Sequence, residues 1–196
     1  MTLEEMTQRV KSLLKPKRFI HSCNVARLAR ELAERNGADA DKAYLAGIIH
    51  DVCKNLPEEE QFTIAHNSDI IWDNAMMASP QLWHAPAGAE YVKREFGIED
   101  PEILLAVRYH TTGRAGMGLM EKILFTADLT SDDREYPGAG ELQELARNNL
   151  DAVVEEGLAF TIQDLSQRRR PVHLDTVRAY NEIVSKKLEA FRAFRP

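Results

Sequence analysis

The chain has 196 residues, of which 44% are hydrophobic and 29% are charged, and its formal net charge is −6. This length suffices for one sizeable core, and the composition excludes an intrinsically disordered chain. The acidic balance argues against a protein that coats DNA or RNA, because such proteins neutralise phosphates with a basic surface. We therefore expect a single domain over residues 1–196 and no nucleic-acid polymer as partner. A small anionic ligand is still compatible with this net charge, because its binding needs only a local positive pocket.

Helical signals follow one another along the chain, and strand signals are scarce. Thr2 opens a Thr-x-x-Glu capping box, and apolar residues then recur at helical spacing until Pro16. Gly37 is a good left-handed end for a second helix, and Asp100 followed by proline begins a later one. The expected helices cover residues 3–15, 18–36, 43–52 after a cap at Asp39 or Asp41, 58–65, 82–96, 101–110, 119–129 and, as two or more helices, 140–167 and 173–194; residues 67–78 are ambiguous.

The cysteines and the N-terminal residues indicate a cellular compartment. Cys23 and Cys53 lack the CxxC spacing of a zinc ribbon, and two cysteines do not indicate a disulfide framework. The acidic segment Met1–Glu5 lacks the basic start and apolar run of a signal peptide, and no stretch has the length of a membrane span. These features predict a cytoplasmic protein without a membrane partner.

One group of residues predicts a metal site. His50 and Asp51 are adjacent on a helix, so their side chains point about 100° apart and share an ion only over a helix end or beneath a partner helix. Such a pair alone is weak evidence, since buried histidines are more often satisfied by a neighbour. His21 faces inward on the preceding helix, and Asp128 follows an apolar stretch where an unpaired carboxylate is costly. Two imidazoles and two carboxylates suit iron, manganese or zinc.

These residues, in this order on successive helices, resemble the HD superfamily of metal-dependent phosphohydrolases. Further motifs resemble the YqeK branch of that superfamily over nearly the whole chain. They lie at residues 17–21, 50–54, 84–89, 108–113, 127–134, 170–173 and 176–181. The resemblance implies an all-α HD-domain helical bundle with the metal site between central helices.

The resemblance also implies an activity, which is symmetrical hydrolysis of diadenosine tetraphosphate to two ADP. Iron is the implied metal, and the number of bound ions, one or two, is left open. Whether the protein forms a homodimer is also left open. ADP or GDP is the implied product. The implied metal ligands are His21, His50, Asp51 and Asp128. Asp51, His84 and His110 are the expected catalytic residues. Nucleotide contacts are implied for Arg18, Asp51, Lys54, His84, His110, Ala127, Asp128, Arg134, Arg170, His173 and Asp175. Residues 129–133 are more acidic than the family pattern and lack its proline.

The residue chemistry agrees with hydrolysis of a phosphate anhydride. Phosphoryl transfer mainly needs charge neutralisation and positioning, for which Arg18, Lys54 and Arg134 are of the right type. His84 and His110 can bind phosphate oxygens, protonate the leaving phosphate or hold a second metal, and the sequence leaves these roles open. Two other functions are compatible with the motifs: hydrolysis of a nucleoside monophosphate or deoxynucleotide, and nucleotide binding without turnover. His66 is expected to be an ordinary surface histidine.

Overall fold

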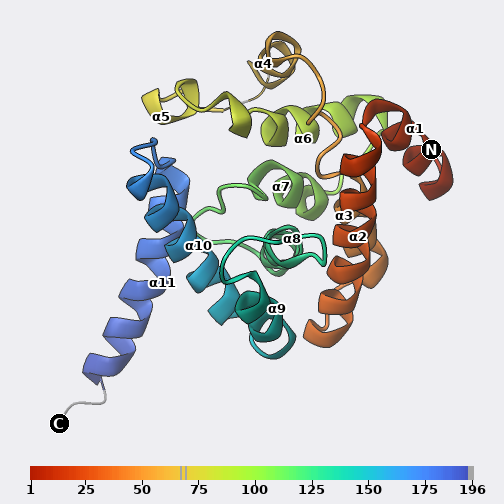
Figure 1. Ribbon diagram of the computed structural model, residues 1–196. Helices are drawn as coiled ribbons and strands as arrows, with labels where there is room; N and C mark the ends of the chain where they lie inside the picture. The colour runs from red at the N-terminus through yellow and green to blue at the C-terminus, as the bar shows by residue number, and fades with distance from the viewer. Residues whose placement is uncertain (67, 69, 194–196) are drawn as a thin grey trace.

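The computed structural model describes residues 1–66, 68 and 70–193, and within them it contains helices and no strand (Figure 1). The all-α prediction is confirmed. The helices are α1 (Leu3–Leu13), α2 (Pro16–Asn36), α3 (Ala40–Ile49), α4 (Glu58–His66), α5 (Asn74–Met77), the 3-10 helix η1 (Pro80–Leu82), α6 (His84–Glu95), α7 (Pro101–Tyr109), α8 (Leu119–Thr130), α9 (Ala139–Asn148), α10 (Leu150–Gln167) and α11 (Leu174–Ala193).

Helix α8 lies at the centre of the bundle and packs against α2, α3, α7, α9 and α10 (Figure 1). Its Ile123 and Leu124 are fully buried in the main hydrophobic core. Burying two such side chains contributes about 2 kcal/mol each to folding. Because Asp128 lies at the end of this buried helix, the core holds its carboxylate against the neighbouring helices.

Helices α2 and α3 cross at close range because Gly47 faces α2. A Cβ atom at Gly47 would lie 2.4 Å from the Cα atom of Ala26, which is shorter than any ordinary contact. The absence of a side chain therefore lets the two backbones touch. This contact brings the end of α3, with His50, beside the first half of α2, with His21.

Several expected boundaries were wrong. Helix α2 begins at Pro16 rather than near Arg18, because proline has a preset φ and its missing N–H costs nothing at the first helical position. Helix α3 ends at Ile49 rather than Val52, and residues 50–55 form turns. The expectation of two or more helices over residues 140–167 and 173–194 holds: residues 140–167 divide at Asn149, whose side chain accepts a hydrogen bond from the N–H of Ala152. Residues 67, 69 and 194 of the expected segments lie outside the described residues.

The residues expected to cap the helices do so in the structure. Thr2 and Glu5 form the capping box, Gly37 has a φ of 72°, and Asp39 rather than Asp41 caps α3. Asp100 caps α7 by accepting from the N–H of Glu102. These contacts are local, so the sequence around each helix end is enough to predict them.

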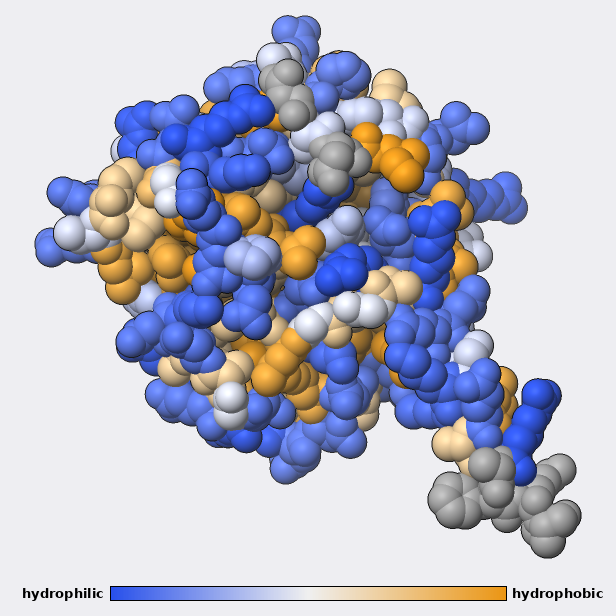
Figure 2. All heavy atoms as spheres, turned by 180° about the vertical axis from the view of Figure 1, so that it is seen from behind, coloured by the Kyte–Doolittle hydropathy of each residue, from blue (hydrophilic) through white to orange (hydrophobic). Residues whose placement is uncertain are grey.

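Helix α11 packs on α10 and then extends away from the body (Figures 1 and 2). Its outer part exposes Leu188 and Phe191. Figure 2 shows a mainly hydrophilic face with hydrophobic residues scattered across it. Among the described residues, no helix combines the length and apolar character that crossing a bilayer requires.

Candidate metal centre and adjoining pocket

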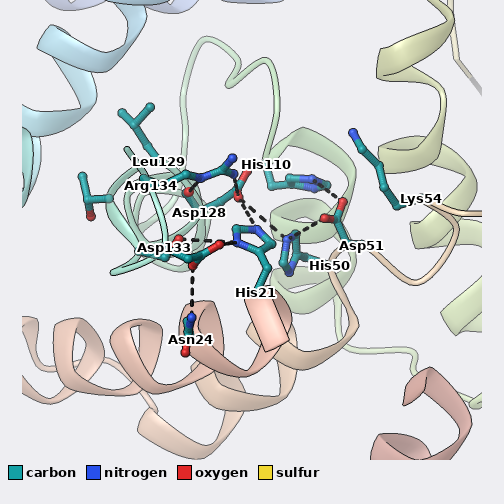
Figure 3. A network of polar contacts seen from close by, with 12 residues as sticks. His21, Asn24, His50, Asp51, Lys54, His110, Asp128, Leu129, Asp133 and Arg134 are labelled. Carbon is teal, nitrogen blue, oxygen red and sulfur yellow. Dashed lines mark hydrogen bonds and ion pairs between the residues drawn. The ribbon is translucent and has the colours of Figure 1, made fainter. Parts of the chain in front are cut away.

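Side chains from α2, from α8 and from the ends of α3 and α7 meet at one place (Figure 3). His21 comes from α2, Asp128 from α8, and His50 with Asp51 from the end of α3. His84 begins α6 and His110 ends α7. All four histidines and Asp51 are buried, and the side chain of Asp128 is 16% exposed.

The four residues expected to hold a metal lie around one point. His21 Nε2 is 2.9 Å from Asp128 Oδ1. His50 Nε2 is 3.4 Å from Asp51 Oδ2 and 3.9 Å from Asp128 Oδ1. Ligand atoms of His21, His50 and Asp51 all lie within 4.8 Å of one another. Because His50 and Asp51 stand at the helix end rather than inside the helix, both face this point despite their adjacent positions.

Three of the histidines are oriented by the same local contact. His50 Nδ1 lies 2.7 Å from the carbonyl of Gly47, three residues earlier. The corresponding distances are 2.8 Å from His84 Nδ1 to Gln81 and 2.7 Å from His110 Nδ1 to Val107. Donation from Nδ1 leaves a lone pair on Nε2, which is the atom a metal binds.

His50 Nε2 is buried and has no hydrogen-bond partner among the residues that the structure describes. An unpaired buried polar atom costs roughly 1–3 kcal/mol, so its retention needs an explanation. A cation between His50, His21 and the two carboxylates supplies the missing partner. The residues present therefore fit a divalent ion, as their nitrogen and oxygen donors also suggest.

A second group of ligand atoms adjoins the first through Asp51. Its Oδ1 lies 3.1 Å from His84 Nε2 and 3.7 Å from His110 Nε2, while its Oδ2 faces His50. The two Nε2 atoms of His84 and His110 are 3.2 Å apart. With both Nδ1 atoms committed to carbonyls, two lone pairs would face each other unless a proton or a cation lies between them.

Three cations surround the acidic groups. Arg18 Nη1 donates to Asp51 Oδ2 at 2.9 Å, and Arg134 donates from Nε to the carbonyl of Asp128 at 2.7 Å and from Nη2 to its carboxylate. Lys54 Nζ lies 3.2 Å from His84 Nδ1. The side chains of Arg18 and Arg134 are each 31% exposed, so both connect the buried centre with solvent.

The charges shift the pKa values of the buried groups. Burial raises the pKa of Asp51, but His50, His110 and His84 outweigh it and hold that pKa well below its ordinary value. Burial also raises the pKa of Asp128, but Arg134 and His21 outweigh this effect and hold that pKa well below its ordinary value. Both carboxylates are therefore ionised at neutral pH, as metal ligands must be.

Burial acts in the other direction on two bases. It lowers the pKa of His84 to about 4, although Asp51 partly opposes this. It also lowers the pKa of Lys54, again against the attraction of Asp51. His84 is therefore neutral at pH 7, and its Nε2 atom, 3.3 Å from Lys54 Nζ, can accept a cation or a proton.

Sequence reasoning missed the residues behind His21. Asp133 Oδ2 lies 2.8 Å from His21 Nδ1, and Asn24 donates to Asp133 Oδ1 at 3.2 Å (Figure 3). Asp133 belongs to the stretch 129–133, which is more acidic than the family pattern. The separation of 112 positions between His21 and Asp133 left no local signal for their contact.

A cavity of about 280 Å³ lies next to the second group of ligand atoms. Its wall includes Thr111 and Thr112, which directly follow His110, and Pro86 on α6. His173 and Asp175, two of the expected nucleotide contacts, line it as well. Ile71 is 78% exposed in this wall, so an apolar surface is available to a ligand.

Three other residues fall elsewhere. Arg170 is exposed just before Pro171 and is not part of that cavity wall. Ala127 is fully buried in the main core, so the expected nucleotide contact stays a prediction and would involve its backbone. His66 is exposed, as expected, and stacks on Phe62.

The family model of the HD domain matches residues 18–154, and the chain belongs to the HD domain family. The chain is 41% identical over 185 residues to a Bacillus subtilis protein named bis(5'-nucleosyl)-tetraphosphatase, symmetrical, covering 94% of this chain and 99% of that protein. A Staphylococcus aureus protein of the same name is 33% identical over 183 residues, covering 92% and 94%.

A solved structure agrees with the fold. It is a predicted HD superfamily hydrolase described as involved in NAD metabolism, from Clostridium acetobutylicum, with a TM-score of 0.91 and 32% identity. The similarity covers 95% of this chain and 98% of that chain. The expected HD-type helical bundle is thus confirmed.

Proposed function

We propose that this protein hydrolyses dinucleoside tetraphosphates symmetrically, converting diadenosine tetraphosphate to two ADP in a metal-dependent reaction. The observation that carries the proposal is the buried, unpartnered Nε2 atom of His50, which faces His21, Asp51 and Asp128. The substrate follows from the names of relatives that align over nearly the whole chain.

The proposed ligands of the first ion are His21, His50, Asp51 and Asp128, with iron as the preferred metal and manganese or zinc as alternatives. When bound, a divalent ion lowers the pKa of water and offsets charge on a phosphoryl oxygen. Asp128 is now paired with Arg134, and Asp51 with Arg18. With an ion held by these carboxylates, the guanidinium groups of Arg18 and Arg134 would be available to phosphate oxygens.

We assign a second ion to Asp51, His84 and His110, because a cation relieves the 3.2 Å approach of the two Nε2 atoms. Asp51 would be a ligand in both groups, because its Oδ2 faces His50 and its Oδ1 faces His84 and His110. Metal analysis of the loaded protein tests this assignment, with two ions per chain expected for the wild type and one for His110→Ala. One ion in both proteins contradicts it and leaves the role of acid or phosphate ligand to His84 and His110.

The proposed substrate contacts follow from the same geometry. Arg18, Lys54 and Arg134 neutralise the polyphosphate beside the ions. The cavity next to His110 takes one nucleoside, with Ile71 and Tyr109 against the base and the carboxylates of Asp73 and Asp175 available to its amino group. His173 lies in the same wall, and Arg170 contacts the nucleotide from the exposed turn before it.

The decisive experiment is product analysis. Metal-loaded protein is incubated with diadenosine tetraphosphate, and the nucleotides are separated by chromatography. ADP as the sole product supports the proposal, whereas equal ATP and AMP overturns the symmetrical cleavage. Parallel incubations with nucleoside monophosphates and deoxynucleotides test the other hydrolase function, and calorimetry with tight binding but no turnover would indicate a binding module.

We further propose that the protein acts in the cytoplasm as a single domain. Its two cysteines are free, which suits a reducing compartment. A homodimer is the proposed assembly, and light scattering of the purified chain tests it.

A further inference from the structure

One histidine of the centre differs from the other three. The Nδ1 atoms of His50, His84 and His110 lie against backbone carbonyls, whereas that of His21 lies 2.8 Å from the carboxylate of Asp133. A carboxylate is a stronger acceptor than a neutral carbonyl, and hydrogen bonds to it are roughly twice as strong. His21 is therefore held by charge as well as by geometry.

The position of Asp133 follows from a turn after α8. The N–H of Arg134 donates to the carbonyl of Ser131 at 2.9 Å, which closes the turn directly after the helix. The turn directs two neighbouring side chains to different partners, Arg134 to Asp128 and Asp133 to His21. The contact therefore depends on the same segment that follows the proposed metal aspartate (Figure 3).

Asp133 is itself held in place from α2. Asn24 lies one turn after His21 on the same face of that helix and donates to Asp133 Oδ1 at 3.2 Å. Arg27, one turn further along, donates to the amide oxygen of Asn24. This contact fixes the amide so that its NH₂ group faces Asp133. The carboxylate thus has each oxygen on a defined donor, Oδ1 on Asn24 and Oδ2 on His21.

We infer that Asp133 is a positioning residue, which keeps His21 protonated at Nδ1, aims Nε2 at the metal position and strengthens it as a ligand. The inference rests on the metal site proposed above. A carboxylate behind a histidine ligand fixes its ring and raises its basicity, and loss of such a partner costs about 10- to 100-fold in metal affinity.

The test measures the dissociation constant of Mn²⁺ for the metal-free protein, read from the electron paramagnetic resonance signal of the free ion. Asp133→Ala should raise the constant about 10- to 100-fold. Asp133→Asn keeps an acceptor for the Nδ1 proton but removes the charge, so its constant should rise by less. Asp132→Asn is the matched control, since it removes the same charge from an exposed neighbour and should leave the constant unchanged.

Melting curves of the metal-free variants separate a loss of ligand strength from a loss of fold. The Asp133 side chain is 32% exposed, so both variants should melt close to the wild type. Wild-type affinity in either Asp133 variant overturns the inference, and so does an equal loss in Asp132→Asn. A wild-type protein that binds no Mn²⁺ overturns the metal site itself, whereas unaltered binding in the variants leaves that site standing.

Discussion

The turn at the end of α3 decides which nitrogen of His50 can bind an ion. Its Nδ1 is committed to Gly47, and its Nε2 is buried among His21, Asp51 and Asp128. A bound ion would offset the cost of this unpaired buried nitrogen. The positions of its two ring nitrogens therefore favour a role for His50 as a metal ligand over a purely structural role.

Removal of single ligands tests this conclusion. We expect His50→Ala and Asp128→Ala each to remove the first ion and abolish hydrolysis, because each removes a donor that faces that ion. His66→Ala should retain both, since His66 is exposed and contacts Phe62 instead. Metal content is measured by mass spectrometry of the purified proteins, and normal metal content in Asp128→Ala would refute the proposed ligand set.

The low pKa of His84 predicts how stability depends on pH. Its value is about 4 in the folded protein against 6.5 for an ordinary histidine. Between these values the unfolded chain holds a proton that the folded chain lacks, so the free energy of unfolding falls as the pH falls from 6.5 toward 4. The metal-free wild type should lose about 2 kcal/mol from this group between pH 7 and pH 5.

Chemical denaturation at the two pH values measures that loss. The His84→Gln variant cannot titrate at this position and serves as the reference. It should lose correspondingly less stability over the same interval. Equal losses in the two proteins would show that His84 is not held neutral by burial.

At the scale of elements, the close crossing of α2 and α3 holds two parts of the centre together. Gly47 contributes both to the crossing, through its missing side chain, and to the site, through its carbonyl. Helix packing and ligand orientation therefore depend on one residue. No sequence signal around Gly47 separates this role from that of an ordinary helix glycine, which destabilises a helix slightly.

Gly47→Ala should lower the free energy of unfolding by about 3 kcal/mol, because the new Cβ atom meets the backbone of Ala26 and the helices must separate. It should also weaken metal binding, since the acceptor for His50 moves with the helix. Gly140→Ala in α9 is the control, because a Cβ atom there meets nothing within 4 Å. That change should be neutral or stabilise by up to about 1 kcal/mol.

Urea denaturation of the three proteins measures both effects. A Gly47→Ala protein as stable as the wild type would mean that α2 and α3 can separate without cost, contrary to the close packing described above.

At the scale of the whole molecule, the proposed ion would connect helices that are distant in the sequence. The proposed ligands come from α2, from the end of α3 and from α8. An ion that binds only the folded arrangement must stabilise the entire bundle. Metal binding and global stability should therefore change together.

At a free metal concentration 100 times the dissociation constant, stabilisation is about 2.7 kcal/mol, which raises the melting temperature by about 5–10 °C for a chain of this size. Calorimetry of the chelated protein with and without added Mn²⁺ measures this shift. Asp128→Ala, which lacks a ligand of the first ion, should show a smaller shift. An unchanged melting temperature in the wild type would contradict an ion shared by several helices.

The sequence by itself determined the helical class, most of the caps and the types of residue at the centre. Signals for these features lie within a few positions of one another, as at Thr2, Asp39 and Asp100. The tertiary structure alone decided that Asp51 faces two groups of histidines and that Asp133 supports His21. These contacts join atoms brought together by the packing of α2, α3, α6 and α7 around α8, and no local pattern encodes a distance between remote side chains.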